Sequence, residues 1–185
     1  MIITLSTDFI DELSTRYTYK GHTQILDSNH YYTASILIND TPFVACIPLH
    51  SYCRANFVPI LPPNKSSHWR SHGLEYGKTI LLTSDDLTNY ASIGGVDEIV
   101  WNNILLKQEL IVKEVKEYFI EIMNSLTKKE LGLWLSRFEK QNLNYSTLNC
   151  FPEHIATLRK YDISQLEFKF VSCSTIESLI DLITG

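Results

Sequence analysis

The chain of 185 residues lacks any apolar run that approaches the roughly 18–20 residues of a membrane-spanning helix. Its beginning, MIITLSTDFIDELS, is acidic and amphipathic and does not have the layout of a signal peptide. Internal repeats and low-complexity tracts are also absent. We therefore expect a cytoplasmic protein without a membrane partner. The length fits one domain, or one domain with an appendage.

Cysteine is sparse, and its spacing matches no metal site. Cys46, Cys53, Cys150 and Cys173 are widely separated, without a C-x-x-C pair or a Cys/His ligand spacing. The pattern argues against structural zinc, and we expect no cofactor. Cys46 and Cys173 lie in apolar alternations, where a free thiol usually acts as a small core residue. Four reduced thiols are typical of a cytoplasmic protein.

A positive net charge is absent as well. The formal charge of −5 at pH 7 argues against a generic nucleic-acid-binding protein. The charge is uneven: residues 1–80 carry six Lys/Arg, six Asp/Glu and five of the six histidines, whereas residues 81–185 carry ten Lys/Arg and fifteen Asp/Glu. We expect any polyanion to bind the first half. With 44% hydrophobic residues, the chain can bury a sizeable core.

The first half of the chain has the pattern of short strands joined by turns. Residues 31–38 (YYTASILI) are rich in β-branched and aromatic residues. Residues 39–42 (NDTP) predict a turn, because Asn and Asp tolerate turn backbones and proline fixes φ. Residues 43–49 then return as the antiparallel partner. Further strands are predicted at 2–5, 57–61, 78–83 and 166–171, a loop or irregular hairpin at 15–30, a long loop at 50–72 and a turn at 73–77.

Helical spacing of apolar residues is typical of the second half. Residues 97–126 predict a single helix of about 30 residues. Thr127 and Glu130 have the spacing of a capping box, which predicts another helix to residue 138. Helices are also predicted at 8–13, at 151–160 and, after a capping box of Ser174 and Glu177, at 176–183. Strands first, helices later and one late strand indicate an α+β fold.

Protonatable and cationic side chains collect at the ends of two predicted strands. They are His50, Ser51 and Arg54 after the first, and His68, Arg70, His72, Glu75, Tyr76 and Lys78 before the second. Cleavage of RNA without a metal needs a base for the 2′-hydroxyl, a group that holds negative charge and an acid for the leaving oxygen. Histidine, arginine, lysine and hydroxyl side chains supply these functions.

Each of these residues also has a plainer interpretation. Ser51 fits a turn or a cap, Lys78 fits an edge lysine that discourages aggregation, and His68 and His72 fit solvated loop histidines. Cys53 near His50 suggests a thiol-dependent hydrolase, although no orienting Asn or Asp is identifiable. A non-catalytic RNA-binding or protein-binding module is a further alternative.

Two segments carry a family resemblance. Residues 47–51 (IPLHS) are similar to an "I-P-L-x-S" segment, and residues 73–78 (GLEYGK) are similar to a "G-L-D-Y-x-K" segment before an apolar strand. With the hairpin 31–51 and the long helix, they resemble the endoribonuclease toxins of type III toxin–antitoxin systems, the ToxN, AbiQ, TenpN and CptN group. The TenpN-like branch is the most similar. The resemblance covers roughly residues 1–126.

The resemblance implies a MazF/Kid-like fold, in which a strongly bent antiparallel β-sheet carries a long helix and additional C-terminal helices. It implies metal-independent cleavage of cellular or phage mRNA by attack of the 2′-hydroxyl, which leaves a 2′,3′-cyclic phosphate and a 5′-hydroxyl. It further implies inhibition by a small repeated antitoxin RNA within a hetero-oligomeric RNA–protein assembly, and a role in phage defence.

The two similar segments and the cationic and titratable side chains of the first half together give the site residues. The catalytic candidates are Ser51, which matches the family's active-site serine, His50, Lys78 and Arg54; the RNA-binding candidates are His30, Lys20, Lys65, His68, Arg70, His72 and Tyr76. Two positions depart from the family: His30 replaces Lys or Arg, and Arg54 is shifted from the expected basic position. Residues 127–185 have no counterpart, so we expect a core at 1–126 and a C-terminal helical extension with one strand packed on it.

Overall fold

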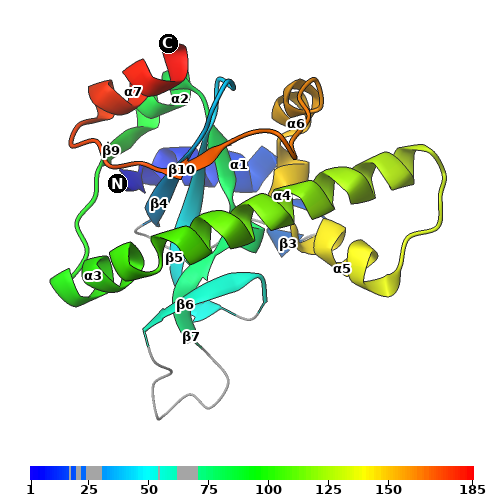
Figure 1. Ribbon diagram of the computed structural model, residues 1–185, viewed down its shortest axis with the longest axis horizontal. Coiled ribbons are helices and arrows are strands. Elements are labelled where there is room, and N and C mark those ends of the chain that lie inside the picture. The colour runs from blue at the N-terminus through cyan, green and yellow to red at the C-terminus, as the bar shows by residue number, and fades with distance from the viewer. Residues whose placement is uncertain (17, 20–21, 24–30, 54, 62–70) are drawn as a thin grey trace.

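The computed structural model describes residues 1–16, 18–19, 22–23, 31–53, 55–61 and 71–185, which form a mixed α/β protein built on an antiparallel sheet (Figure 1). Its strands are β1 (Ile2–Leu5), β4 (Tyr31–Ile38), β5 (Val44–Cys53), β6 (Phe57–Leu61), β7 (Ser71–Glu75), β8 (Ile80–Leu82), β9 (Ala91–Ile93) and β10 (Phe168–Phe170). A separate pair comprises β2 (Thr18–Tyr19) and β3 (His22–Thr23).

The helices lie mostly in the second half of the chain. They are α1 (Thr7–Arg16), α2 (Ser84–Tyr90), α3 (Glu98–Leu106), α4 (Gln108–Glu130), α5 (Arg137–Tyr145), α6 (Pro152–Leu158) and α7 (Ile176–Thr184), with 3-10 turns η1 (Tyr76–Lys78) and η2 (Thr147–Cys150). None of the described helices combines the length and the apolar character needed to cross a membrane.

The hairpin of β4 and β5 is the centre of the sheet, whose strand order is β6-β7-β5-β4-β1-β9. Each central strand changes its outer neighbour along its length. β5 pairs with β8 at residues 44–46 and with β7 at residues 49–53, while β4 pairs with β1 at 31–34 and with β10 at 36–38. β10, from the C-terminal region, is therefore part of the same sheet as the N-terminal strands.

The predicted turn between β4 and β5 is confirmed. Asp40 has a left-handed backbone, with φ of 62°, and Thr41 donates from both its amide and its hydroxyl to the carbonyl of Ile38. Aspartate tolerates this backbone region better than most residues. The short connection makes β4 and β5 antiparallel, as the sequence predicted.

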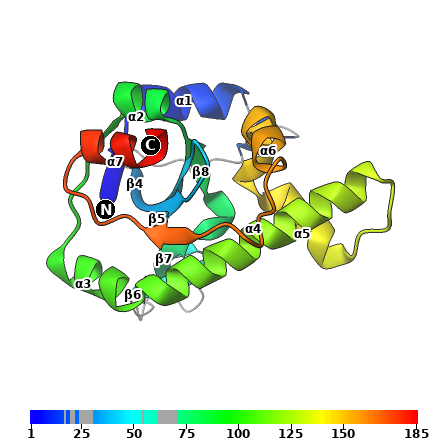
Figure 2. The same cartoon turned by 45° about the horizontal axis from the view of Figure 1, so that its top comes forward.

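Alternation along β5 divides the core between the two faces of the sheet. Ala45 and Ile47 join the apolar cluster under α4, whereas Val44 and Cys46 join the cluster under α1, α2 and α7. Successive side chains of a strand point to opposite faces, so one strand supplies both clusters. Figure 2 shows α1, α2 and α7 on one side of the sheet and α3 and α4 on the other.

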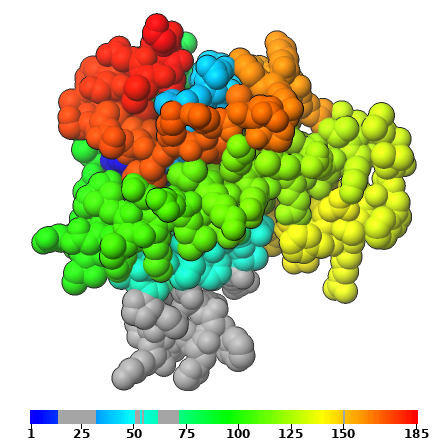
Figure 3. All heavy atoms as spheres, viewed as in Figure 1, coloured from blue at the N-terminus to red at the C-terminus, as the bar shows by residue number. Residues whose placement is uncertain are grey.

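α4 covers one face of the sheet with a single apolar stripe. Its buried residues Ile111, Val115, Phe119 and Ile122 recur at helical spacing, and the ring of Phe119 meets that of Phe168 on β10 at 5.4 Å between centroids. In the space-filling view, α3 and α4 form a continuous band between the C-terminal segment above and β6 and β7 below (Figure 3).

The second half departs from the predicted helices in two places. The single helix predicted at 97–126 is two helices, because Lys107 interrupts it with φ of −108° and ψ of 8°. The helix predicted to start at Thr127 is wrong: Thr127 lies inside α4, where its hydroxyl donates to the carbonyl of Met123. The boundary expected at residue 126 therefore falls within α4.

The capping box that opens the next helix lies nine residues further on. The hydroxyl of Ser136 accepts from the amide of Glu139, and the Glu139 carboxylate accepts from the amide of Ser136, so α5 begins at Arg137. The predicted helices at 8–13, 151–160 and 176–183 correspond to α1, α6 and α7. At α7 the cap is Thr175 rather than Ser174.

The strands at 2–5, 31–38 and 57–61 are confirmed, and the strand predicted at 166–171 is present in shortened form as β10. The strand predicted at 78–83 is shorter too, since β8 comprises Ile80–Leu82. The loop predicted at 50–72 is wrong at its ends, because β5 continues to Cys53 and β7 begins at Ser71. The turn predicted at 73–77 is instead the second half of β7 followed by η1.

Candidate functional site

The candidate site begins at a β-bulge where β5 pairs with β7. His50 lies opposite Gly73, and Cys53 lies opposite Ser71, so three steps on β5 match two steps on β7. The extra residue on β5 belongs to the stretch that contains Ser51. Residues three apart on a regular strand face opposite sides, whereas one extra residue restores the same face. The bulge therefore places His50 and Cys53 on one face.

Gly73 allows three strands to meet at this point. It pairs with His50 on one side and with Pro59 of β6 on the other, where the register shifts again. A Cβ atom added at Gly73 would lie 2.4 Å from the carbonyl oxygen of Val58 and 2.9 Å from the ring of Phe57. The absence of a side chain is thus required for the close approach of β6 to β7.

His50 and Glu75 form the polar centre of the site. Glu75 lies two residues after Gly73 and so shares the face of β7 that meets His50. The Nδ1 atom of His50 lies 3.3 Å from Oε2 of Glu75, whose side chain is 5% exposed, while that of His50 is 26% exposed. A carboxylate at Nδ1 orients the imidazole and leaves Nε2 as the atom for proton transfer.

Cys53 lies beside this pair as a buried thiol. Its Sγ atom contacts the carbonyl oxygens of His50 at 3.4 Å and Gly73 at 3.5 Å. Burial, with the nearby charge of Glu75, raises the pKa of Cys53 to about 12. The thiol is therefore protonated at neutral pH, which argues against the thiol-dependent hydrolase. Donor atoms of His50, Cys53 and Glu75 lie within 4.8 Å of one another.

Tyr76 and Lys78 connect the site to the helices. The hydroxyl of Tyr76 donates to Glu114 of α4 at 3.3 Å, and burial, together with Glu114, raises the pKa of Tyr76 to about 12. The buried ammonium of Lys78 donates to the carbonyl of Tyr145 at 3.0 Å and lies 4.7 Å from its ring centroid. Tyr145 ends α5, where a cation complements the helix dipole.

The structure brings some of the predicted residues together and separates others. His50 and the backbone of Ser51 lie at the bulge on β5. The neighbouring strand β7 continues into η1, which carries Tyr76 and Lys78. His72 lies next to Gly73 on β7, and strand alternation places it on the face opposite Glu75. Six candidates lie outside the described residues: Lys20, His30, Arg54, Lys65, His68 and Arg70.

Glu75 is the residue that sequence reasoning noted but did not assign to the site. Its sequence signal was its place in the GLEYGK segment, where the similar family segment carries an aspartate. Its pairing with His50 depends on the register between β5 and β7. No spacing along the chain encodes that register.

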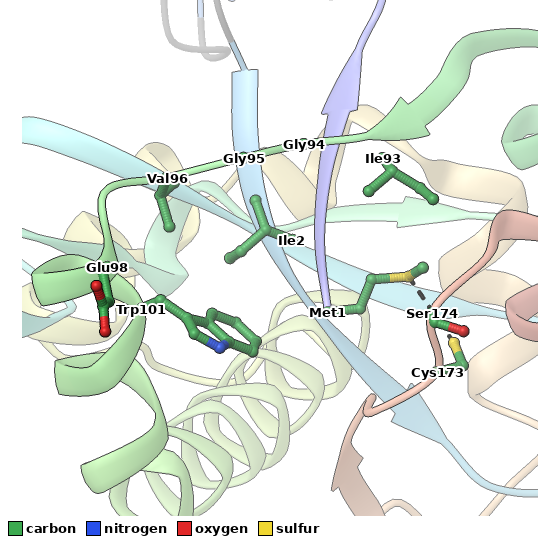
Figure 4. A pocket seen from close by; sticks show the side chains of 10 residues that line it. All are labelled: Met1, Ile2, Ile93, Gly94, Gly95, Val96, Glu98, Trp101, Cys173 and Ser174. Carbon is green, nitrogen blue, oxygen red and sulfur yellow. Dashed lines mark hydrogen bonds between the residues drawn. The ribbon is translucent and has the colours of Figure 1, made fainter.

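A separate hollow lies where β1 and β9 approach the segment before α7 (Figure 4). Its volume is about 430 Å³, and its lining includes Ile2, Val96 and Trp101, with the Sγ of Cys173 at 3.8 Å from the Sδ of Met1. Among the described residues that line it, Glu98 is the one with a charged side chain. None of the predicted site residues that the structure describes lines this hollow.

Comparison of the chain with models of protein families, with curated proteins and with solved structures found no match. The function must therefore be argued from the residues at the β5–β7 bulge and from the two sequence segments that they occupy.

Proposed function

We propose that this chain is a metal-independent endoribonuclease in which His50 is the general base and Glu75 positions it. The observation that carries the proposal is the 3.3 Å contact between a buried carboxylate and a partly exposed imidazole. The contact lies next to the bulge that contains Ser51, in the two segments that resemble the endoribonuclease toxins. A base of this kind needs an oriented ring with one nitrogen directed to the substrate.

The proposed reaction is an intramolecular transfer at phosphorus. Nε2 of His50 takes the proton of the ribose 2′-hydroxyl, the 2′ oxygen bonds to phosphorus, and the bond from phosphorus to the 5′ oxygen breaks. The leaving oxygen takes up a proton from an acid, so the products are a 2′,3′-cyclic phosphate and a 5′-hydroxyl. Glu75 stabilises the imidazolium as it forms, because opposite charges attract strongly in a poorly solvated site.

The other predicted residues act around this pair. Ser51 is assigned to orient the scissile phosphate, and Arg54 to hold its negative charge. Lys78 is a positioning residue in this proposal, since its ammonium is anchored at Tyr145 and it follows Glu75 by three residues. Anchoring η1 to the end of α5 keeps the end of β7, and with it Glu75, in place.

The biological role that we propose rests on the resemblance. The chain would be the toxin of a type III toxin–antitoxin system in phage defence, with cellular or phage mRNA as the substrate. A small repeated antitoxin RNA would occupy the same surface and inhibit the enzyme. Its phosphates would attract the cationic and titratable side chains of the first half, and the affinity would fall as salt rises.

The test is cleavage of single-stranded RNA by the purified protein in the presence of EDTA, with detection of new 5′-hydroxyl ends. We expect His50→Ala to slow cleavage by about 100-fold or more. Glu75→Gln should slow it by about 10–100-fold, since the amide keeps the shape but loses the charge. Glu117→Gln on the exposed face of α4 is the matched control and should cleave as the wild type does.

Two outcomes would contradict the proposal. Full activity of His50→Ala would show that this imidazole is not the base, and 5′-phosphate ends would show a different reaction. Binding of RNA without any new ends would instead support the alternative, a non-catalytic RNA-binding module.

A further inference from the structure

His50 and Glu75 share one face of β5 and β7 with the thiol of Cys53, and the donor atoms of these three side chains lie close together. A ring nitrogen of His50, Sγ of Cys53 and a carboxylate oxygen of Glu75 all lie within 4.8 Å of one another, and Nδ1 is the ring nitrogen that lies 3.3 Å from Glu75. We propose that these three residues form a binding site for Zn²⁺. The sequence did not predict this site, because its cysteines and histidines do not have the spacing of a zinc motif.

The backbone explains why the three donors meet. Without the bulge, Cys53 would face the side of the sheet opposite to His50. Glu75 reaches the same face because it is two residues beyond Gly73, the partner of His50. In a tetrahedral zinc site, bond lengths of 2.0–2.3 Å place ligand atoms roughly 3.3–3.8 Å apart. His50 and Glu75 already meet this spacing at 3.3 Å, and Cys53 needs to approach by about 1 Å.

The donor set favours Zn²⁺ over the harder cations. Mg²⁺ and Ca²⁺ take oxygen ligands in sixfold or higher coordination, whereas imidazole and thiolate select Zn²⁺ and related transition metals. Three protein ligands leave a fourth position for water or for a phosphate oxygen of RNA. That position lies on the side of His50, whose side chain is partly exposed, while Cys53 and Glu75 are buried.

Charge balance supports the same ion. The carboxylate of Glu75 is buried, and burial of a charge is costly unless an opposite charge accompanies it. On binding, the Cys53 thiol loses its proton to solvent and its sulfur bonds to Zn²⁺ as a thiolate. One thiolate and one carboxylate then neutralise the two positive charges of the ion, so the buried site becomes neutral overall.

The ion would also control the enzyme, and this consequence rests on the proposed function. Zn²⁺ at Nδ1 of His50 leaves the ring proton on Nε2, so Nε2 cannot accept the proton of a 2′-hydroxyl. Zn²⁺ at the same time occupies the carboxylate of Glu75. Zinc would therefore inhibit cleavage, and a chelator would restore it.

Binding is tested with Co²⁺ as a spectroscopic probe for the zinc site. Co²⁺ added to the metal-free full-length protein should produce the near-ultraviolet thiolate-to-Co²⁺ band at one ion per chain, and Zn²⁺ should abolish it. Cys53→Ser should lose the band, and Cys173→Ser, the matched thiol control, should keep it. Absence of the band in the wild type, or its survival in Cys53→Ser, would overturn the proposal.

A second measurement excludes misfolding as the cause of a lost band. The circular dichroism spectrum and thermal midpoint of metal-free Cys53→Ser should match those of the metal-free wild type within a few degrees. Zn²⁺ should raise the midpoint of the wild type and of Cys173→Ser, because an ion that binds the folded state stabilises it. No rise in the wild type, or an equal rise in Cys53→Ser, would count against the site.

The activity measurement separates the two proposals. The half-inhibitory Zn²⁺ concentration for RNA cleavage should be at least tenfold higher in Cys53→Ser than in the wild type, each relative to its own rate in EDTA. Equal half-inhibitory Zn²⁺ concentrations for Cys53→Ser and the wild type would refute inhibition through this site. If the protein gives the Co²⁺ band and cleaves no RNA, the metal site stands and the proposed nuclease function fails.

Discussion

Replacement of Gly73 by alanine tests the arrangement on which the candidate site depends. The added Cβ would lie 2.4 Å from the carbonyl oxygen of Val58, which is closer than such atoms approach, and the obstacle is backbone rather than a flexible side chain. β6 would therefore have to move away from β7. Because Glu75 follows Gly73 on the same strand, this movement would also disturb its contact with His50.

The magnitude follows from the contacts that are lost. Overpacking of a well-packed region costs about 1–3 kcal/mol. One weakened backbone hydrogen bond between β6 and β7 adds about 1 kcal/mol. We expect Gly73→Ala to lower the free energy of unfolding by about 2–4 kcal/mol, a large part of the total for a domain. With a typical urea slope, the midpoint should fall by about 1–2 M.

Gly95→Ala is the matched control. A Cβ at Gly95 meets nothing within 4 Å, and its backbone is not left-handed. This substitution should leave stability unchanged or raise it by about 0.4–1 kcal/mol, because alanine restricts the unfolded chain. The assay is urea unfolding followed by circular dichroism for both variants. Equal midpoints for Gly73→Ala and Gly95→Ala would refute the register that we assign to β5, β6 and β7.

Four further predictions concern single side chains. Cys53 should resist iodoacetamide in the native state, since a pKa of about 12 leaves about 1 in 10,000 molecules as thiolate at pH 8; rapid labelling in peptide mass spectra would contradict this. Ser136→Ala should cost about 1 kcal/mol. Lys128 and Ser136 lower the pKa of Glu139 to about 2, so the wild type should lose stability between about pH 4.5 and 2. In thermal melts over this pH range, the midpoint of Glu139→Gln should fall less than the midpoint of the wild type. Phe119→Ala should cost about 3–5 kcal/mol, and Trp134→Ala, at an exposed position, less than about 0.5.

Local patterns along the chain were sufficient for many of the elements. The β-branched and aromatic residues of 31–38 and the turn residues 39–42 predicted the central hairpin, because its register depends on neighbours in the sequence. Helix α6 follows from the proline near its first turn. The grouping of His50, Ser51 and Lys78 in two segments also came from the sequence.

Competing local signals were decided by the tertiary structure. Thr127 and Glu130 have the spacing of a capping box, yet α4 continues through them, because Val115, Phe119 and Ile122 bury one uninterrupted stripe against the sheet. The helix ends where Gly132 adopts a left-handed backbone with φ of 66°. Packing over the length of the helix outweighs one cap, which contributes about 1 kcal/mol.

The sequence by itself determined the class of the fold, its central hairpin and which segments carry chemical groups. Only the tertiary structure decided which of those groups meet. The bulge on β5 changes which face Cys53 occupies, and the register with β7 pairs His50 with Glu75 across strands. A shift of one residue in register moves every side chain of a strand to the other face of the sheet. Register in turn is set by contacts between segments that are distant in the sequence.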